Sequence, residues 1–189
     1  MDRYTEGEIY KGINFSKEGL PRGEYENCTF DNCTFLNSSL AGSTFMDCEF
    51  RNCDISMANI ADTAFKEVQF SGCKLLGLHF QGCNKFLLSM NFDNCQLNLS
   101  SFYKLSLKKA TFKNCSLREV DFAEADLSGA AFSNCDLANA MFDNTVLEKT
   151  DFRSSYNYQI DPEKNRIKKA KFSLPEVVGL LDKYGIEIS

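Results

Sequence analysis

Residues 110–132 read ATFKNCSLREVDFAEADLSGAAF and place a large apolar residue at every fifth position. The same period runs back to Phe15 and forward to Phe152, with one interruption after Phe80. A period of five matches neither the helical repeat of 3.6 residues nor the alternation of a strand. It indicates a coil that turns a corner every five residues and directs one side chain inward from each side. The expected inward centres are Phe15, Leu20, Tyr25, Phe30, Phe35, Leu40, Phe45, Phe50, Ile55, Ile60, Phe65, Phe70, Leu75 and Phe80, then Leu87, Phe92, Leu97, Phe102, Leu107, Phe112, Leu117, Phe122, Leu127, Phe132, Leu137, Phe142, Leu147 and Phe152.

The residue two positions before each centre is mostly small, and it is often cysteine, serine or alanine. The unit is shown clearly by Ala125-Asp126-Leu127-Ser128-Gly129, where Ala125 precedes the centre Leu127. Large and small side chains that both point inward would interdigitate in a narrow interior. The other positions are polar or charged, so we expect them to face water.

A second period of twenty residues sets the number of sides. The pair Asn-Cys recurs at Asn32, Asn52, Asn94, Asn114 and Asn134, with Gly72-Cys73 in the same place between Asn52 and Asn94. The spacing is twenty residues, and twenty-two once. Four pentads therefore make one square coil, and about seven coils would stack at the strand spacing of about 4.8 Å. Asparagine or glycine at this corner suits a residue with positive φ. We also expect the asparagine side chains to form a hydrogen-bonded ladder along the edge.

The pattern divides the chain into a cap over 1–14, coils over 15–157 and a C-terminal segment over 158–189. Glu18 occupies a small inward position and marks the first coil as imperfect, because a buried unpaired carboxylate is costly. The register slips by two residues near 81–87. We expect Phe86 and Leu88 to flank the centre Leu87 and to point outward. This slip is either a neutral insertion or a small contact feature.

The C-terminal segment predicts a capping α-helix. Ser173-Leu174-Pro175-Glu176 has the spacing of a capping box, with proline in the first turn. One apolar face follows, and Gly185 is a natural stop. One helix rarely covers both itself and an open coil, so the surplus apolar surface predicts a homodimer through this end. The candidate interface consists of Leu174, Val177, Val178, Leu181, Tyr184, Ile186 and Ile188.

The residues that usually carry chemistry do not form a catalytic pattern. All nine cysteines fall on small inward positions without a Cys-x-x-Cys pair, which favours buried packing over metal binding. The single histidine, His79, sits at an outward position, and phosphate-binding glycine loops are absent from the sequence. We therefore expect a binding protein rather than an enzyme, with no cofactor and no metal.

The bulk properties limit the partners. The net charge is −5, which argues against nucleic-acid binding, and no apolar stretch is long enough to span a membrane. The odd cysteine count, together with the absence of a secretion signal in the sequence, favours reduced thiols in the cytoplasm. Two outward groups are candidate contact surfaces. The acidic group is Glu119, Asp121, Glu124 and Asp126, and the apolar group is Leu36, Met57, Leu76 and Leu99 together with Phe86 and Leu88.

The pentad pattern resembles the pentapeptide-repeat family, which implies a right-handed quadrilateral β-helix. Ile160 to Ile167 (IDPEKNRI) and the ending Tyr184 to Ile188 resemble the gyrase-protecting subgroup that includes Qnr, MfpA and McbG proteins. The resemblance implies a DNA-mimicking dimer, joined at the C-terminal ends, that binds DNA gyrase or topoisomerase IV and protects it from quinolones or a toxin. The alternative is an interaction module with another partner. Many Qnr proteins carry longer projecting loops, whereas this chain has only the two-residue slip.

Overall fold

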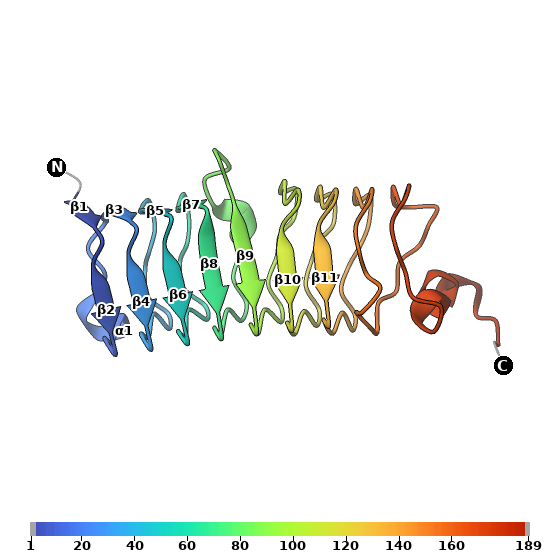
Figure 1. The fold of residues 1–189 in the computed structure, drawn as a ribbon, viewed down its shortest axis with the longest axis horizontal. Coiled ribbons are helices and arrows are strands. Elements are labelled where there is room, and N and C mark those ends of the chain that lie inside the picture. Colours follow the sequence, from blue (N-terminus) through green and yellow to red (C-terminus); the bar gives the residue numbers. More distant parts are fainter. Residues whose placement is uncertain (1–2, 188–189) are drawn as a thin grey trace.

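The computed structural model describes residues 3–187 and is an all-β, right-handed quadrilateral β-helix of about seven coils. The chain winds from one end of a rod to the other, so the two termini lie at opposite ends (Figure 1). The helices and strands are β1 (Arg3–Glu6), β2 (Ile9–Lys11), α1 (Phe15–Glu18), β3 (Gly23–Glu26), β4 (Thr29–Asp31), β5 (Thr44–Met46), β6 (Glu49–Arg51), β7 (Ala64–Lys66), β8 (Val68–Ser71), η1 (Phe80–Gly82), β9 (Met90–Asp93), β10 (Thr111–Lys113), β11 (Ala131–Ser133), η2 (Glu176–Leu180) and η3 (Asp182–Tyr184).

Every strand pair is parallel, and each strand pairs with the one a coil away. One sheet has the order β1-β3-β5-β7, and the other has the order β11-β10-β9-β8-β6-β4-β2. Phe30 pairs with Phe50, which is twenty residues on, whereas Phe70 pairs with Phe92, which is twenty-two residues on. The coil therefore keeps its stacking across the slip, and two extra residues are accommodated in one coil.

We number the four sides of the coil in chain order. The first side is the seven-stranded sheet, the second contains Leu97 and Leu117, the third contains Phe102 and Phe122, and the fourth is the four-stranded sheet continued by Leu107 and Leu127. At the edge after the first side, Asn32, Asn52, Asn94, Asn114 and Asn134 all have φ between 52° and 55°, and Gly72 has φ 66°. This confirms that the twenty-residue asparagine period marks a corner with positive φ.

The core is a set of stacked aromatic and aliphatic columns. On the first side, Phe92, Phe112 and Phe132 stack face to face, with ring centroids 5.1 and 4.8 Å apart. Rings of the third side meet them edge-on, as Phe112 meets Phe122 at 6.0 Å. Such offset and edge-on pairs add to the hydrophobic burial of each ring.

The predicted asparagine ladder is largely absent. One rung exists, where the Asn134 amide donates to Asn114 Oδ1 at 2.9 Å. The Asn114 amide instead donates to Asp93 Oδ1 at 3.2 Å, and the Asn32 amide donates to Asp31 Oδ1. A neighbouring carboxylate is a stronger acceptor than a second amide, so it captures the donor wherever the sequence supplies one.

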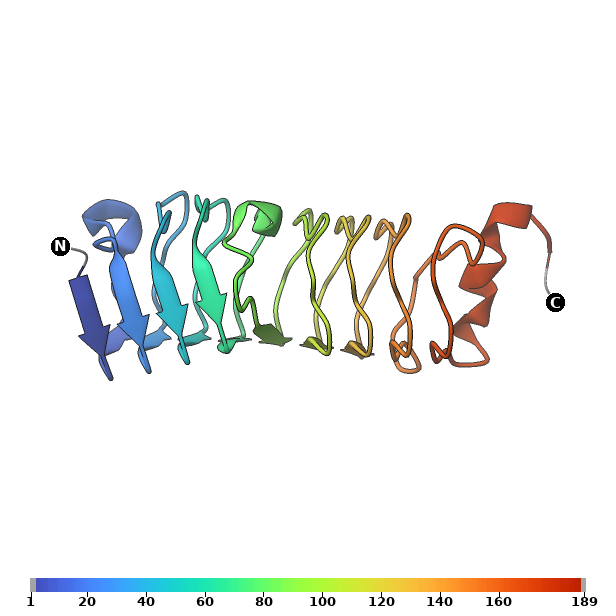
Figure 2. The same ribbon diagram turned by 90° about the horizontal axis from the view of Figure 1, so that it is seen from above.

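The β-pairing begins inside the segment that the sequence analysis assigned to the N-terminal cap. β1 pairs with β3, and β2 pairs with β4, so residues 3–11 already contribute two sides of a coil. Tyr10 stacks on Phe30 with centroids 4.8 Å apart. Glu18 is exposed at the end of the one-turn helix α1 (Figure 2), so its carboxylate is not buried.

The expectation that Leu87 is an inward centre is wrong. Leu87 is 65% exposed with φ 56°, while Leu88, expected to point outward, packs partly against the core. Phe86 does point outward and is 69% exposed. The extra residues lie in a loop over 84–89, because the Asn84 amide still bonds Thr63 O and the Ser89 amide bonds Phe65 O. The green loop beside β9 rises above the rod at this point in Figure 1.

The predicted capping α-helix is also wrong, because the C-terminal cap consists only of the 3₁₀ turns η2 and η3. Gly179 lies in the middle of η2, and its carbonyl accepts the Ile160 amide at 3.0 Å instead of continuing a helical ladder. A glycine in a helix interior also lowers helical propensity. A 3₁₀ turn has three residues instead of 3.6, so it directs the side chains differently from the expected α-helix. As a result, Leu180 packs on the core and Leu181 is exposed. Ile186 is in no strand, and Ile188 lies outside the described residues.

The cysteines fill the small inward positions. All nine are free and buried. Cys53 Sγ, for example, donates to Phe30 O and to Arg51 O, both at 3.3 Å, and the Thr63 hydroxyl makes the equivalent bond to Leu40 O. Each such group occupies little volume and satisfies an interior carbonyl. Burial also raises the pKa of Cys48 and of Cys83 to about 12, which keeps these thiols protonated.

We therefore predict that a thiol reagent finds no reactive cysteine in the native protein at neutral pH. Modification requires an exposed thiolate, and burial removes both the exposure and the charge. Ellman's reagent should titrate none of the nine thiols in native buffer and all nine in guanidinium chloride. Rapid modification of the native protein would contradict structural packing and would indicate an accessible cysteine.

Candidate interaction surfaces

Four of the apolar candidates, Leu36, Met57, Leu76 and Leu99, lie with Glu119 along one edge, whereas Phe86 and Leu88 belong to the loop over 84–89. Met57 and Leu99 are 60% and 61% exposed at the corner after the second side, and Leu36 is also exposed. Leu76, which was expected to be exposed, is half-buried. The Met57 side chain leans over Gly77, where an added Cβ would lie 2.6 Å from Met57 Sδ. The Leu99 amide bonds Arg118 O, which places Glu119 one coil beyond Leu99 on the same edge. A partner that contacts this edge can therefore touch both groups.

The four acidic candidates do not form one patch. Asp121 lies on the third side beside Ser101 and Met141, whereas Asp126 lies on the fourth side beside Ser106 and Val146. Glu119 and Glu124 are at the two corners that flank the third side, and both are exposed. The group therefore spreads around the rod rather than presenting a single acidic face.

Two of these carboxylates have structural partners that the pentad pattern does not reveal. Asp121 is half-buried and accepts the Ala123 amide at 2.9 Å and the Ser101 hydroxyl at 3.2 Å. Asp126 accepts the amide and hydroxyl of Ser128. Burial opposes the ionisation of Asp126, but the hydrogen bonds from Ser128 outweigh it, so its pKa lies below the ordinary value. Both side chains fix turns.

Glu124 is exposed but shares its charge with neighbours. It accepts the Tyr103 hydroxyl at 2.9 Å and pairs with Lys104 Nζ at 3.3 Å. The hydrogen bond from the Tyr103 hydroxyl and the positive charge of the nearby Lys104 ammonium hold the pKa of Glu124 below its usual range. Among the described residues, no ion pair involves Glu119. Glu119 is therefore the candidate carboxylate with the most freely available charge.

The C-terminal end is held on the rod by polar contacts from the segment IDPEKNRI. Lys183 Nζ lies 2.7 Å from both Asp161 Oδ1 and Glu163 Oε2, and the Tyr184 hydroxyl donates to Glu163 at 3.2 Å. These carboxylates raise the pKa of Lys183 above its ordinary value. The motif therefore positions η3 against the last coil.

The candidate dimer residues are mostly exposed at this end. Leu174 is 87% exposed, Val177 is half-buried, and Val178, Leu181, Tyr184 and Ile186 are exposed. An open hollow of about 740 Å³ lies beside them, lined by Tyr158, Gly179, Leu181 and Ile186 among others. These side chains leave apolar surface exposed at the C-terminal end of the described residues.

The sequence analysis missed an ion pair on the second side, between Arg118 and Asp136. Asp136 is buried at an outward position, where Arg118 Nε lies 2.6 Å from Asp136 Oδ2 and the Asn157 amide donates to Asp136 Oδ1 at 2.9 Å. Burial opposes the charge of Asp136, but these two donors outweigh it and lower its pKa. A spacing of about twenty residues between opposite charges is the signal that could have identified the pair.

Chemistry-bearing groups do not converge within residues 3–187. No set of three or more histidine, cysteine, aspartate or glutamate side chains in this range forms a metal-binding cluster. In the same range, no helix is long and apolar enough to cross a membrane. The His79 ring is exposed and contacts only the Gln81 amide among side chains. The arrangement therefore offers outward contact surfaces.

Comparison with known proteins identifies the class to which this fold belongs. A family profile described as "Pentapeptide repeat region" matches residues 24–85 and 86–157. The chain therefore belongs to the pentapeptide-repeat family. Solenoids of this kind are typically structural or binding proteins rather than enzymes. No curated protein matches the chain in sequence.

Solved structures share the fold. A trypsin-treated form of QnrB1, described as a plasmid-mediated fluoroquinolone resistance protein, superposes with a TM-score of 0.64 at 20% identity and covers 100% of both chains. HetL from the cyanobacterium Nostoc, a pentapeptide-repeat protein involved in heterocyst differentiation regulation, has a TM-score of 0.55 at 13% identity, covering 90% of this chain and 86% of HetL. At these identities the similarity shows the fold alone.

Proposed function

We propose that this solenoid binds a bacterial type II topoisomerase, DNA gyrase or topoisomerase IV, in the cytoplasm, and protects it from quinolones or a topoisomerase-directed toxin. The observation that carries the proposal is an unbroken stack of parallel coils, which displays charged side chains at steps of about 4.8 Å on a rigid rod. Regularly spaced acids on such a rod present a partner with the charge pattern of duplex DNA. The resemblance of the C-terminal segment to gyrase-protecting proteins gives the proposal its target.

The acidic surplus lies toward the N-terminal end. Residues 1–70 carry twelve acidic and six basic side chains, whereas residues 71–189 carry fourteen acidic and fifteen basic ones. A DNA-binding surface on a topoisomerase is positively charged, so the acidic end of the rod and Glu119 are the parts that would compete with DNA. A homodimer joined at the C-terminal ends would place the two acidic ends farthest apart and present a longer rod.

The first experiment is gyrase supercoiling titrated with this protein, with and without a quinolone. Inhibition at high concentration or rescue from the drug supports the proposal. An unchanged drug response with both gyrase and topoisomerase IV from the same organism would overturn it.

We predict that the E119K/E124K double variant binds the topoisomerase about tenfold more weakly than wild type, because it reverses two outward charges without entering the core. The E8K/E18K double variant makes the same charge change on exposed residues of the acidic N-terminal end and tests whether that end also contributes to binding. Binding measured by surface plasmon resonance at two salt concentrations tests this. Loss in both variants would assign binding to the acidic end and to Glu119 together, loss in E119K/E124K alone would confine it to Glu119 and Glu124, and no loss in either would remove the electrostatic argument for these carboxylates. Asp126 is left out because it fixes a turn.

A second candidate function rests on the exposed apolar side chains of the edge after the second side. Leu36, Met57 and Leu99 expose apolar surface along successive coils, as a contact surface for another protein does. A partner bound through them would show little salt dependence, whereas binding through acids weakens as salt rises. Replacement of Met57 and Leu99 by serine should weaken partner binding if the apolar edge is the contact surface, and should leave binding unchanged if the acids are.

A further inference from the structure

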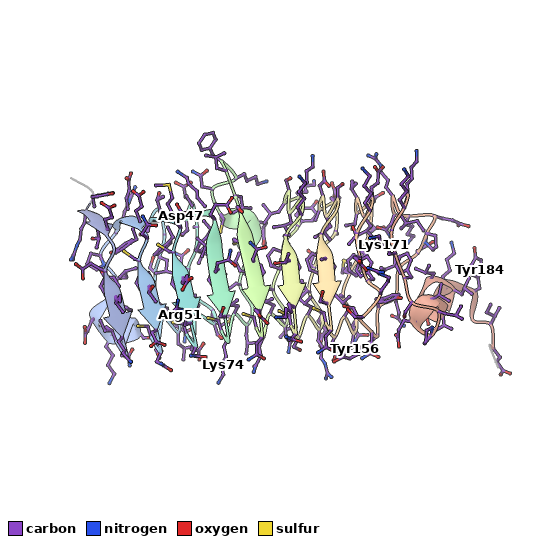
Figure 3. All side chains as sticks on the ribbon, in the orientation of Figure 1. Asp47, Arg51, Lys74, Tyr156, Lys171 and Tyr184 are labelled. Carbon is purple, nitrogen blue, oxygen red and sulfur yellow. The ribbon has the colours of Figure 1, made fainter. Side chains whose placement is uncertain are left out.

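One edge of the rod reverses the sign of its charge along its length. This edge lies between the fourth and the first side, and each of its corner residues immediately precedes a strand or centre of the first side. Asp47 and Glu67 occupy the corner before β6 and β8, and Lys109, Lys149 and Lys169 occupy it in later coils. Uncharged residues, Gly7, Asn27 and Gly129, occupy it in the remaining coils. We call this the charged edge. Figure 3 labels Asp47 toward its upper N-terminal part, and nitrogen-tipped side chains extend from the upper edge near the C-terminal end.

These corner side chains are available for contact. Asp47, Glu67, Lys109, Lys149 and Lys169 are all exposed. Backbone bonds stack the corners, since the Asp47 amide bonds Lys66 O and the Lys149 amide bonds Lys168 O. Within residues 3–187, no ion pair joins any of these five to another side chain. Their charges are therefore not neutralised within the chain.

The positions just before the corners continue the reversal. Glu6 and Glu26 lie in register on the N-terminal part, and Lys108 and Lys168 lie on the C-terminal part. Two side chains of this row have the opposite sign and are engaged locally. Lys66 lies 5.9 Å from the centre of the Phe86 ring, and Glu148 pairs with Arg166 at 2.6 Å. Lys108 is also engaged, with Asp126 at 3.2 Å, and Glu6 and Glu26 accept the Tyr4 hydroxyl. The reversal therefore rests on the sign of most side chains in the row and not on which of them are engaged.

The loop over 84–89 stands at the point where the sign changes. Glu67 precedes β8, the loop precedes β9 and Lys109 precedes β10, so these three features occupy consecutive coils of the edge. The loop exposes Phe86 and Leu87. Beside it lies a hollow of about 300 Å³, lined by Glu67, Leu88, Met90, Leu107 and Lys109 among others.

We infer that the charged edge binds the same edge of a second copy of this chain, with the two rods antiparallel and a two-fold axis through the loop. Rotation about this axis brings acidic coils opposite basic coils at one, three and four coils from the loop, whereas at two coils Asp47 faces the uncharged Gly129. Glu67 then faces the second copy's Lys109, one coil from the axis. Glu26 faces the second copy's Lys149 at three coils, and Glu6 faces the second copy's Lys169 at four coils.

The exposed Phe86 and Leu87 of the loop lie at the centre of this contact. At the axis, the Phe86 ring of each copy enters the hollow beside the loop of the other, which buries an exposed aromatic group. A two-fold contact of this kind uses the same patch on both copies and closes without further growth. A buried anchor near the centre and a polar rim around it are common features of protein interfaces. This contact is separate from the candidate dimer residues at the C-terminal end, so a chain that uses both would form larger assemblies.

Analytical ultracentrifugation of the full chain over a range of concentrations tests the inference. At low ionic strength we expect reversible dimers whose dissociation constant rises at least about tenfold in several hundred millimolar NaCl, because salt screens exposed pairs. With Leu174→Asp and Leu181→Asp also present to remove pairing through the C-terminal end, the K149E/K169E and E6K/E26K variants should each be monomeric, and an equimolar mixture of the two should form dimers again. Glutamate is compatible with the corner backbone, since Glu67 and Glu119 have φ 52° and 57°.

The control variant K17E/K74E makes the same charge change away from the edge, and Figure 3 labels Lys74 at the opposite, lower edge. It should dimerise like wild type. A Phe86→Ser variant should dimerise more weakly at every salt concentration. All measurements are repeated with Leu174→Asp and Leu181→Asp added, which removes pairing through the C-terminal end.

Three results would overturn the inference. The first is dimers in K149E/K169E as strong as in wild type. The second is failure of the mixed charge-reversed variants to associate although each is folded by circular dichroism. The third is a chain that becomes wholly monomeric once the C-terminal residues are replaced.

Discussion

Replacement of Phe112 by alanine should lower the free energy of unfolding by about 3–5 kcal/mol, which is the range measured for deletion of a buried aromatic side chain. Phe112 is fully buried, and its ring contacts four others. It stacks on Phe92 and Phe132 and meets Phe102 and Phe122 edge-on at 6.0 Å. Truncation removes all four contacts, and the neighbouring coils are fixed by backbone bonds, so the cavity cannot collapse.

Urea unfolding followed by circular dichroism measures this loss. Phe112→Leu is the conservative variant and should cost only about 1 kcal/mol, because leucine fills the equivalent position on other sides. Ser133→Ala, an exposed position on the same side, should stay within about 0.5 kcal/mol of wild type. A loss of less than about 1.5 kcal/mol for Phe112→Ala, which is half the lower limit of the expected range, would mean that the coils relax around the cavity.

Replacement of Gly179 by alanine should detach the C-terminal cap. A Cβ at this position would lie 2.0 Å from the carbonyl oxygen of Tyr158, which is backbone and cannot move aside. Alanine favours a helix by about 1 kcal/mol over glycine, so propensity alone predicts stabilisation. The steric clash destabilises the cap instead, and we expect the free energy that holds the cap in place to fall by about 3 kcal/mol.

Hydrogen exchange reports this loss directly, because the Ile160 amide donates to Gly179 O at 3.0 Å. Its exchange should accelerate about a hundredfold, which corresponds to about 3 kcal/mol. Amides of the central coils, such as that of Phe112, should keep their protection. Val178→Ala, at an exposed neighbouring position, is the control. Unchanged exchange of Ile160 in Gly179→Ala would show that the cap does not depend on this close approach.

The candidate surfaces were only partly predictable from the sequence. The pentad period correctly placed Phe86, Leu36, Met57 and Leu99 outward. It also treated Glu119 and Asp126 as equivalent outward acids. Asp126 is instead held by Ser128, because an aspartate just before a turn is close enough to bond the amide two residues on. Periodicity assigns a side chain to a side of the coil, but it does not report the hydrogen bonds that the side chain makes there.

The sequence by itself determined the coil. Its five-residue and twenty-residue periods specify inward centres, four sides and corners with positive φ, because a side chain of the wrong size or polarity at any of these positions would disrupt the stack. Only the tertiary structure decided where the period breaks. It placed Leu87 outside the core and Leu88 against it, since the Asn84 and Ser89 amides kept their bonds to the previous coil and the residues between them had to loop outward. It also replaced the expected α-helix with 3₁₀ turns, because contact between Gly179 and Tyr158 outweighs helical periodicity. The sign reversal along the charged edge likewise emerges only when residues twenty apart are stacked.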